Sequence, residues 1–312
     1  MSTALVAARP AAPGGSRQPQ PQQRQVSVAE LQAALVAAQR GDFAAAAWGG
    51  HRSAHSSRAT GPGATAESAW RLGWSTVTVL AGHAGAGAST VALAIAEAAS
   101  TAGTRVELVD CADPGRSGLA GVSTAELGGD SLGWRRARRG HIQVDRLTDR
   151  IEALTDVPTP RLVAGSEPAG AGLLVIDLGW PATATISTPG WISELIANEP
   201  IVVVCRVSVP GVQQTDQLLA ELPRPAIVAA VGPRRWPGVV NASCGAGLRA
   251  AQASGRIVTV PTVGPLAVTG LTADPLPRPL AVAGRELTAL IHRLTPARAG
   301  LVDETETKDL SC

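Results

Sequence analysis

The chain has 312 residues, of which 45% are hydrophobic, and it carries 27 Lys and Arg against 25 Asp and Glu. This length is enough for one domain of ordinary size with additional tails, and a net charge of +2 provides no bulk attraction to nucleic acid. The only lysine is Lys308, near the carboxyl end, so the sequence excludes a phosphate-loop lysine, a Schiff-base lysine and a Tyr–Lys reductase pair.

Residues 1–70 form a low-complexity extension rich in Ala, Pro and Gln. Residues 1 to about 25 cannot bury a core and are predicted to be disordered, and residues 49–70 are predicted to be a linker. Ser27 and Glu30 make a capping box, which predicts one short helix at about 27–39. A domain is expected over 71–297, and the acidic residues 298–312 are expected to form a loose tail.

From residue 75 onward, short apolar runs alternate with helical patterns. This alternation is typical of an α/β protein with a doubly wound, mostly parallel sheet, as in P-loop NTPases. Strands are predicted at 75–81, 104–109, 173–176, 201–205, 226–231 and 257–260, and helices at 89–102, 189–198, 211–222, 240–254 and 279–294.

A glycine-rich segment lies between the first predicted strand and its helix, where open α/β sheets bind ligands. It fits the P-loop pattern G-x-x-x-x-G-K-[ST], except that Ala88 stands at the lysine position. Its backbone amides and the following helix can hold a phosphate, but the lysine charge is missing. Alternatively, the segment is a turn that binds nothing. The candidate cofactor-binding residues are Gly82, His83, Ala84, Gly85, Ala86, Gly87, Ala88, Ser89 and Thr90.

This segment resembles the deviant Walker A motif K-G-G-x-G-K-[ST] of the ParA/MinD family of P-loop ATPases. His83 and Ala88 replace both lysines of the motif, which marks a degenerate member. Downstream, Val106–Pro114 resembles the family's V-x-L-I-D-x-D-P stretch with one extra residue, and Leu173–Asp177 resembles its Walker B strand. The likeness continues through Ile201–Gln217 and spans about residues 75–295.

The resemblance implies that ATP binds with Mg²⁺. It further implies that Asp110 is the catalytic, water-positioning carboxylate, and that Ser89 and Asp177 act on the metal. Each aspartate can equally be a residue that caps the turn after its strand. The resemblance also implies a protein partner and a nucleotide-linked homodimer.

The leading hypothesis is a nucleotide-binding or scaffold protein with weak or no ATP hydrolysis, serving plasmid or chromosome partition, septum placement or conjugative-element maintenance. One alternative is an active ATPase in which another residue replaces the lysine. A second is a Rossmann-type dinucleotide enzyme, although Thr90 stands where G-x-G-x-x-G requires its last glycine.

The one dense basic run, Arg135–Arg139, is expected to be a solvated insertion loop, or else to contact nucleic acid, acidic partners or an anionic membrane surface. A bolder hypothesis is that Arg116 or one of these arginines folds over the phosphate loop and replaces the missing charge. Trp236 is expected to be a packing anchor, with stacking on a purine as the alternative.

The four cysteines are far apart and form no C-x-x-C pair, which argues against zinc and disulfides and favours a reducing compartment. We find no signal peptide, and no run of about 18 apolar residues that would span a membrane. The sequence therefore predicts a cytoplasmic protein.

Overall fold

A computed structural model describes residues 74–160 and 172–294, and all of these belong to one compact unit, Pro62–Cys312. The extension at 1–70, its expected helix at 27–39 and the acidic tail at 298–312 lie outside the described residues. None of the described helices is long and apolar enough to cross a membrane.

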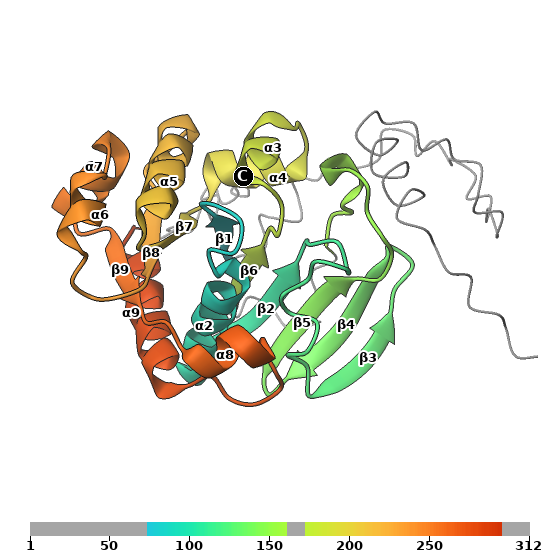
Figure 1. The fold of residues 1–312 in the computed structure, drawn as a ribbon. Coiled ribbons are helices and arrows are strands. Elements are labelled where there is room, and N and C mark those ends of the chain that lie inside the picture. Colours follow the sequence, from blue (N-terminus) through green and yellow to red (C-terminus); the bar gives the residue numbers. More distant parts are fainter. Residues whose placement is uncertain (1–73, 161–171, 295–312) are drawn as a thin grey trace, which may run out of the picture. The chain divides into compact units, whose positions relative to one another are not determined.

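The described strands form one nine-stranded sheet in the order β3-β4-β5-β2-β6-β1-β7-β8-β9 (Figure 1). In this spatial order, each pair of neighbours from β5 through β2, β6, β1, β7 and β8 to β9 is parallel. Strands β3, β4 and β5 pair antiparallel at one side of the sheet. The expected doubly wound, mostly parallel sheet is therefore confirmed. The strands are β1 (Ser75–Ala81), β2 (Arg105–Asp110), β3 (Ala125–Gly129), β4 (Trp134–Arg139), β5 (Ile142–Leu147), β6 (Gly172–Asp177), β7 (Ile201–Arg206), β8 (Ile227–Val231) and β9 (Ile257–Val260).

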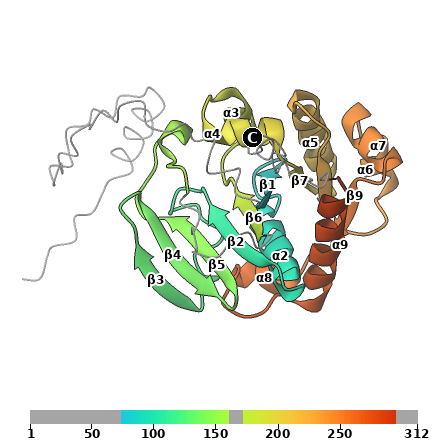
Figure 2. The same cartoon turned by 180° about the vertical axis from the view of Figure 1, so that it is seen from behind.

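Helices cover both faces of the sheet (Figures 1 and 2). Residues of α2 and α9 share one buried apolar cluster with the strands, while α4, α5 and α7 contribute to clusters on the opposite face. Because the central strands are buried on both sides, they are almost continuously apolar in sequence. The helices are α2 (Ala88–Thr101), α3 (Ala182–Ser187), α4 (Trp191–Asn198), α5 (Val209–Glu221), α6 (Gly238–Ala242), α7 (Ala246–Ala253), α8 (Gly264–Thr269) and α9 (Arg278–Leu294), with a 3-10 turn η2 (Leu154–Asp156).

The helices α2 and α9 approach each other closely, because small residues line the contact. A Cβ atom at Gly284 of α9 would collide with the backbone carbonyl of Ala94 in α2. The alanine-rich sequence of α2 keeps its own surface flat, and most of its side chains are buried. Two segments from opposite ends of the described chain thus share one core.

The predicted helix at 240–254 is in fact two helices, α6 and α7. The chain turns at Gly245, where a Cβ atom would collide with the carboxylate of Asp216 in α5. That carboxylate accepts a hydrogen bond from the Leu248 N–H (2.8 Å) in the first turn of α7. A side chain from another helix therefore starts α7 anew, and the only local sequence signals for this break are Gly245 and Gly247.

The basic run is strand β4, so the expectation of a solvated insertion loop is wrong. Trp134, Ala137 and Arg139 of this strand are buried, whereas Arg135 and Arg138 are exposed. The strand is held between β3 and β5, and its buried positions pack against the sheet's apolar clusters.

Arg139 anchors this antiparallel edge to the rest of the domain. Its Nε–H donates to Glu97 of α2 (2.7 Å), and its terminal nitrogens donate to the carbonyls of Val122, Thr272 and Asp274. A buried, fully paired guanidinium of this kind is structural. Arg139 is therefore unavailable for nucleic acid or membrane contact.

Candidate functional site

The three strand ends singled out from the sequence lie side by side at one edge of the sheet. Strand β6 runs between β2 and β1, so Asp110, Asp177 and the loop after β1 meet at their carboxyl ends. Asp110 and Asp177 are direct partners in the β2–β6 register. This is where doubly wound sheets place their ligands.

The loop after β1 leads into an open helix N-terminus. The Gly82 N–H donates to the Val204 carbonyl (2.8 Å), which fixes the start of the loop to β7. Gly85 and Gly87 have φ of 71° and 102°, a region that favours glycine, and Gly87 is the N-cap of α2. No described side chain caps α2, and its first turn holds no acidic residue. The first amides of α2 are therefore left to a ligand or to water.

His83, at the place of the first motif lysine, is held within its own chain. Its Nε2 accepts the backbone N–H of Arg206 (3.1 Å), so its Nδ1 carries the proton and donates to the Ala84 carbonyl (2.9 Å). The Arg206 Nε–H donates to the Gly85 carbonyl (3.1 Å). His83 and Arg206 thus tie the phosphate loop to the end of β7. No sequence motif predicts this contact of Arg206 with the loop.

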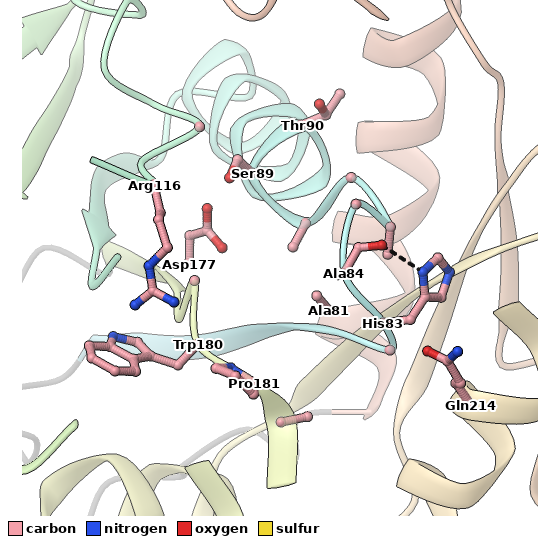
Figure 3. Close-up of a pocket in the computed structure, with 18 of the residues that line it drawn as sticks. Ala81, His83, Ala84, Ser89, Thr90, Arg116, Asp177, Trp180, Pro181 and Gln214 are labelled. Atoms are coloured by element: carbon pink, nitrogen blue, oxygen red, sulfur yellow. Dashed lines mark hydrogen bonds between the residues drawn. The ribbon is translucent and has the colours of Figure 1, made fainter. Parts of the chain in front are cut away.

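A cavity of about 730 Å³ opens beside the loop, and all nine residues from Gly82 to Thr90 line it (Figure 3). Asp177 lies on its floor, and Arg116 and Trp180 form a wall across from His83. Side chains of α5, among them Gln214 and Gln217, line the remaining side. The structure thus brings the predicted loop residues and Asp177 into one hollow.

Asp177 is fully buried, and neither carboxylate oxygen forms a hydrogen bond with any described residue. Burial, together with the charge of the adjacent Asp110, raises the pKa of Asp177 from its ordinary 3.8 to about 7. The Ser89 hydroxyl and the Gly179 N–H lie close enough to oppose this shift, although neither forms a hydrogen bond of normal geometry. An unpartnered buried carboxylate is costly unless a ligand completes it.

The donor set around Asp177 fits Mg²⁺. The ion takes hard oxygen ligands and usually binds through one or two carboxylates together with substrate phosphates. Asp177 supplies an unpartnered carboxylate, and Ser89 supplies a hydroxyl on the same cavity wall. No group of three His, Cys, Asp or Glu within 74–160 and 172–294 forms an all-protein metal cage.

Asp110, the predicted catalytic carboxylate, has different surroundings. One of its oxygens accepts the Ala112 N–H (3.0 Å) and the other accepts the Ser117 hydroxyl (2.5 Å). Burial raises the pKa of Asp110, while these two hydrogen bonds and the charge of Arg146 lower it. Asp110 lines a separate cavity of about 240 Å³ rather than the hollow beside the loop. Both the water-positioning role and the ribose contact of a dinucleotide enzyme require the Asp110 carboxylate to face the ligand. The position of Asp110 therefore supports neither role.

Of the arginines considered as replacements for the missing lysine charge, Arg116 alone remains a candidate. Arg116 lines the cavity beside the loop, whereas none of the arginines in β4 does. Arg135 lines the smaller cavity beside Asp110, and Arg136 forms an ion pair with Asp145 (3.8 Å). Trp180 also lines the cavity, although no sequence motif singles it out as a candidate site residue.

Trp236 does not line the cavity. It packs instead against the apolar cluster of β7, β8, α5 and α7, in agreement with the expected packing anchor.

No protein-family model matches the sequence, and no curated protein matches it either. The chain is similar to MinD and ParA ATPases in structure. A chain of the MinC:MinD cell division complex of Aquifex aeolicus has 15% identity and a TM-score of 0.45, with 69% of this chain and 96% of that chain covered. The ParA family ATPase of Chlorobium tepidum TLS has 14% identity and a TM-score of 0.45, with 69% and 98% covered. The cell division ATPase MinD of Pyrococcus furiosus has 16% identity and a TM-score of 0.45, with 71% and 99% covered. The similarity is weak and assigns neither an activity nor a partner to this chain.

Proposed function

We propose that the chain is a degenerate ParA/MinD-like protein that binds ATP with Mg²⁺, hydrolyses it weakly or not at all, and serves as a scaffold or regulator. The observation that carries this proposal is Asp177, a buried carboxylate without a hydrogen-bond partner among the described residues, at the floor of a cavity walled by an open helix N-terminus. A polyanion with a bound cation would satisfy both the first amides of α2 and this carboxylate.

In this proposal, the backbone N–H groups of the loop and of the first turn of α2 hold the phosphates. Ser89 and Asp177 would hold Mg²⁺, which supplies positive charge to the phosphate oxygens when bound. The glycines at 85 and 87 let the backbone adopt the left-handed conformations that the loop requires. The binding function therefore rests mainly on backbone groups, which the loss of a lysine leaves in place.

Weak hydrolysis follows from three side chains. Ala88 offers no ammonium group to stabilise charge in the transition state. Asp110 lines a separate cavity and not the one beside the loop, so its carboxylate is not placed to position a water molecule on the ligand. His83 is tied to Arg206 and Ala84, so it does not take the place of a lysine that reaches into a second subunit.

Restoring the lysine provides the sharpest test. Ala88→Lys is expected to tighten ATP binding in the presence of Mg²⁺ by roughly tenfold to a hundredfold, because hydrogen bonds to charged groups contribute about 1.5–3 kcal/mol. Isothermal titration calorimetry on the full chain measures this change. Ala102→Lys, an exposed position at the opposite end of α2, adds the same charge as a matched control and should leave the affinity unchanged.

Two results would contradict the proposal. Absence of ATP binding by both the wild type and Ala88→Lys, with folding verified by circular dichroism, would show that the loop is a turn without a ligand. Phosphate release well above background by the wild type, abolished in Asp110→Ala, would favour the active ATPase instead.

The sequence resemblance extends the proposal to cellular roles. Plasmid or chromosome partition, septum placement or conjugative-element maintenance would each require a protein partner, and a homodimer is part of the same proposal. Since His83 is engaged within its own chain and no lysine stands in the loop, we propose that any such dimer does not depend on bound ATP. Sedimentation of the full chain with and without ATP tests this, and a dimer that forms only with ATP would contradict it.

A further inference from the structure

The wall of the cavity opposite His83 carries a cation on a fixed aromatic platform. The guanidinium of Arg116 lies 4.8 Å from the centroid of the Trp180 ring, within the range of a cation–π contact. The indole N–H of Trp180 donates to the Cys111 carbonyl (2.7 Å), which holds the ring in place. Figure 3 shows the guanidinium above this ring and beside Asp177.

The backbone around Arg116 is held on both sides. The Arg116 N–H donates to the Asp113 carbonyl (2.8 Å), and the Asp113 carboxylate accepts the N–H groups of Gly115 (2.9 Å) and Ile151 (3.1 Å). On the other side, the Ser117 hydroxyl is bound to Asp110. The segment thus presents an arginine at a defined place on the cavity wall, rather than on a free loop.

Arg116 is also the one cationic side chain of the cavity. Among the described lining residues, no other is a lysine or arginine, whereas Asp177 and Glu221 are acidic. Arg116 takes part in none of the ion pairs found among residues 74–160 and 172–294, and its side chain is exposed to the cavity and solvent. Its guanidinium is therefore available to an anion.

We infer that Arg116, stacked on Trp180, supplies the cation for the terminal phosphate of a bound nucleoside triphosphate, in place of the lysine absent at position 88. The inference rests on the proposed function. Figure 3 places Asp177 between Arg116 and the loop, so an anion that contacts both the loop amides and Arg116 extends past Asp177, as a chain of phosphates would. The planar guanidinium can hold two phosphate oxygens at once. Arg116 is thus the residue that distinguishes ATP from ADP.

Affinities of the full chain for ATP and for ADP, each with Mg²⁺, test this inference by isothermal titration calorimetry. Arg116→Ala is expected to weaken ATP binding by about tenfold or more and ADP binding much less, so that the preference for ATP is lost. Arg116→Lys should recover part of the ATP affinity. Trp180→Leu, which removes the platform but not the charge, should give an intermediate loss. Arg138→Ala, an exposed arginine of β4 outside the cavity, is the matched control and should change neither affinity.

The outcomes separate this inference from the proposal beneath it. Wild-type binding of ATP that is unchanged in Arg116→Ala would overturn the role of Arg116 and leave the nucleotide site standing. Equal losses for ATP and ADP would overturn its role as the residue that recognises the terminal phosphate. Failure of the wild type and of Ala88→Lys to bind either nucleotide would overturn both the site and the inference.

Discussion

The carboxyl ends of β2 and β6 carry two buried aspartates at paired positions, yet their surroundings differ. Asp110 is satisfied by its own loop, through the Ala112 N–H and the Ser117 hydroxyl. Asp177 faces the cavity and has no hydrogen-bond partner among the described residues. Burial raises the pKa of both carboxyls, but only Asp177 has a place for a ligand beside it. The same residue at the same depth can thus complete a loop on one strand and face a cavity on the next.

The largest expected effect of this difference is on how the free energy of unfolding depends on pH. Burial raises the folded-state pKa of Asp177 from 3.8 to about 7, so the folded chain binds more protons than the unfolded chain between these values. The contribution of Asp177 to stability is therefore lost as pH rises through this window. Relative to the wild type, Asp177→Asn should gain unfolding free energy from pH 4 to pH 8, by roughly 4 kcal/mol at most. Urea unfolding across this range measures it, and a difference that does not grow with pH would refute it.

Removing Asp110, the carboxylate that has hydrogen-bond partners, should instead lower the free energy of unfolding. Asp110→Ala leaves the Ala112 N–H and the Ser117 hydroxyl without their acceptor, and it should lower the unfolding free energy by about 2–3 kcal/mol. Asp110→Asn retains one acceptor oxygen and should lose less. Urea unfolding at pH 7 provides both values. If Asp110→Ala is stabilising, the two carboxylates are equivalent in their effect on stability, which contradicts the contrast drawn between them.

The smallest effect concerns the ligand. If Asp177 alone faces the metal, Asp177→Asn should remove the dependence of ATP affinity on Mg²⁺, a change of about tenfold or about 1.4 kcal/mol. Asp110→Ala should keep this dependence, since its carboxylate does not line the cavity. Titrations with Mg²⁺ and with EDTA distinguish the two variants. If only Asp110→Ala loses the dependence of ATP affinity on Mg²⁺, then Asp110 and not Asp177 holds the metal.

Much of the sheet and the loop could be predicted from local patterns. The apolar runs that end in Asp110 and Asp177 fixed two strands and their tips, and the spacing of Gly82 and Gly87 placed the loop between β1 and α2. Parallel strands buried on both faces leave strong sequence signals, and their carboxyl ends necessarily share one edge.

What the sequence missed depends on partners far away in the chain. The four arginines of β4 predict a solvated loop, whereas in the fold Arg139 donates to Glu97 in α2 and to carbonyls beyond residue 270. The bond from Arg206 to the loop spans more than a hundred residues. The position of Arg116 over Trp180 is set by two separate turns, so the sequence offered it only as one candidate among several.

The close contact between α2 and α9 has a consequence for how the protein is made. Gly284 of α9 sits against the backbone of Ala94, so the apolar face of the first described helix is covered by the last one. During synthesis, the alanine-rich apolar surface of α2 remains exposed until α9 has left the ribosome, and an exposed surface of this kind is prone to aggregate. Nascent chains that stop before Arg278 should accordingly require chaperones, because the core closes only when the final helix arrives.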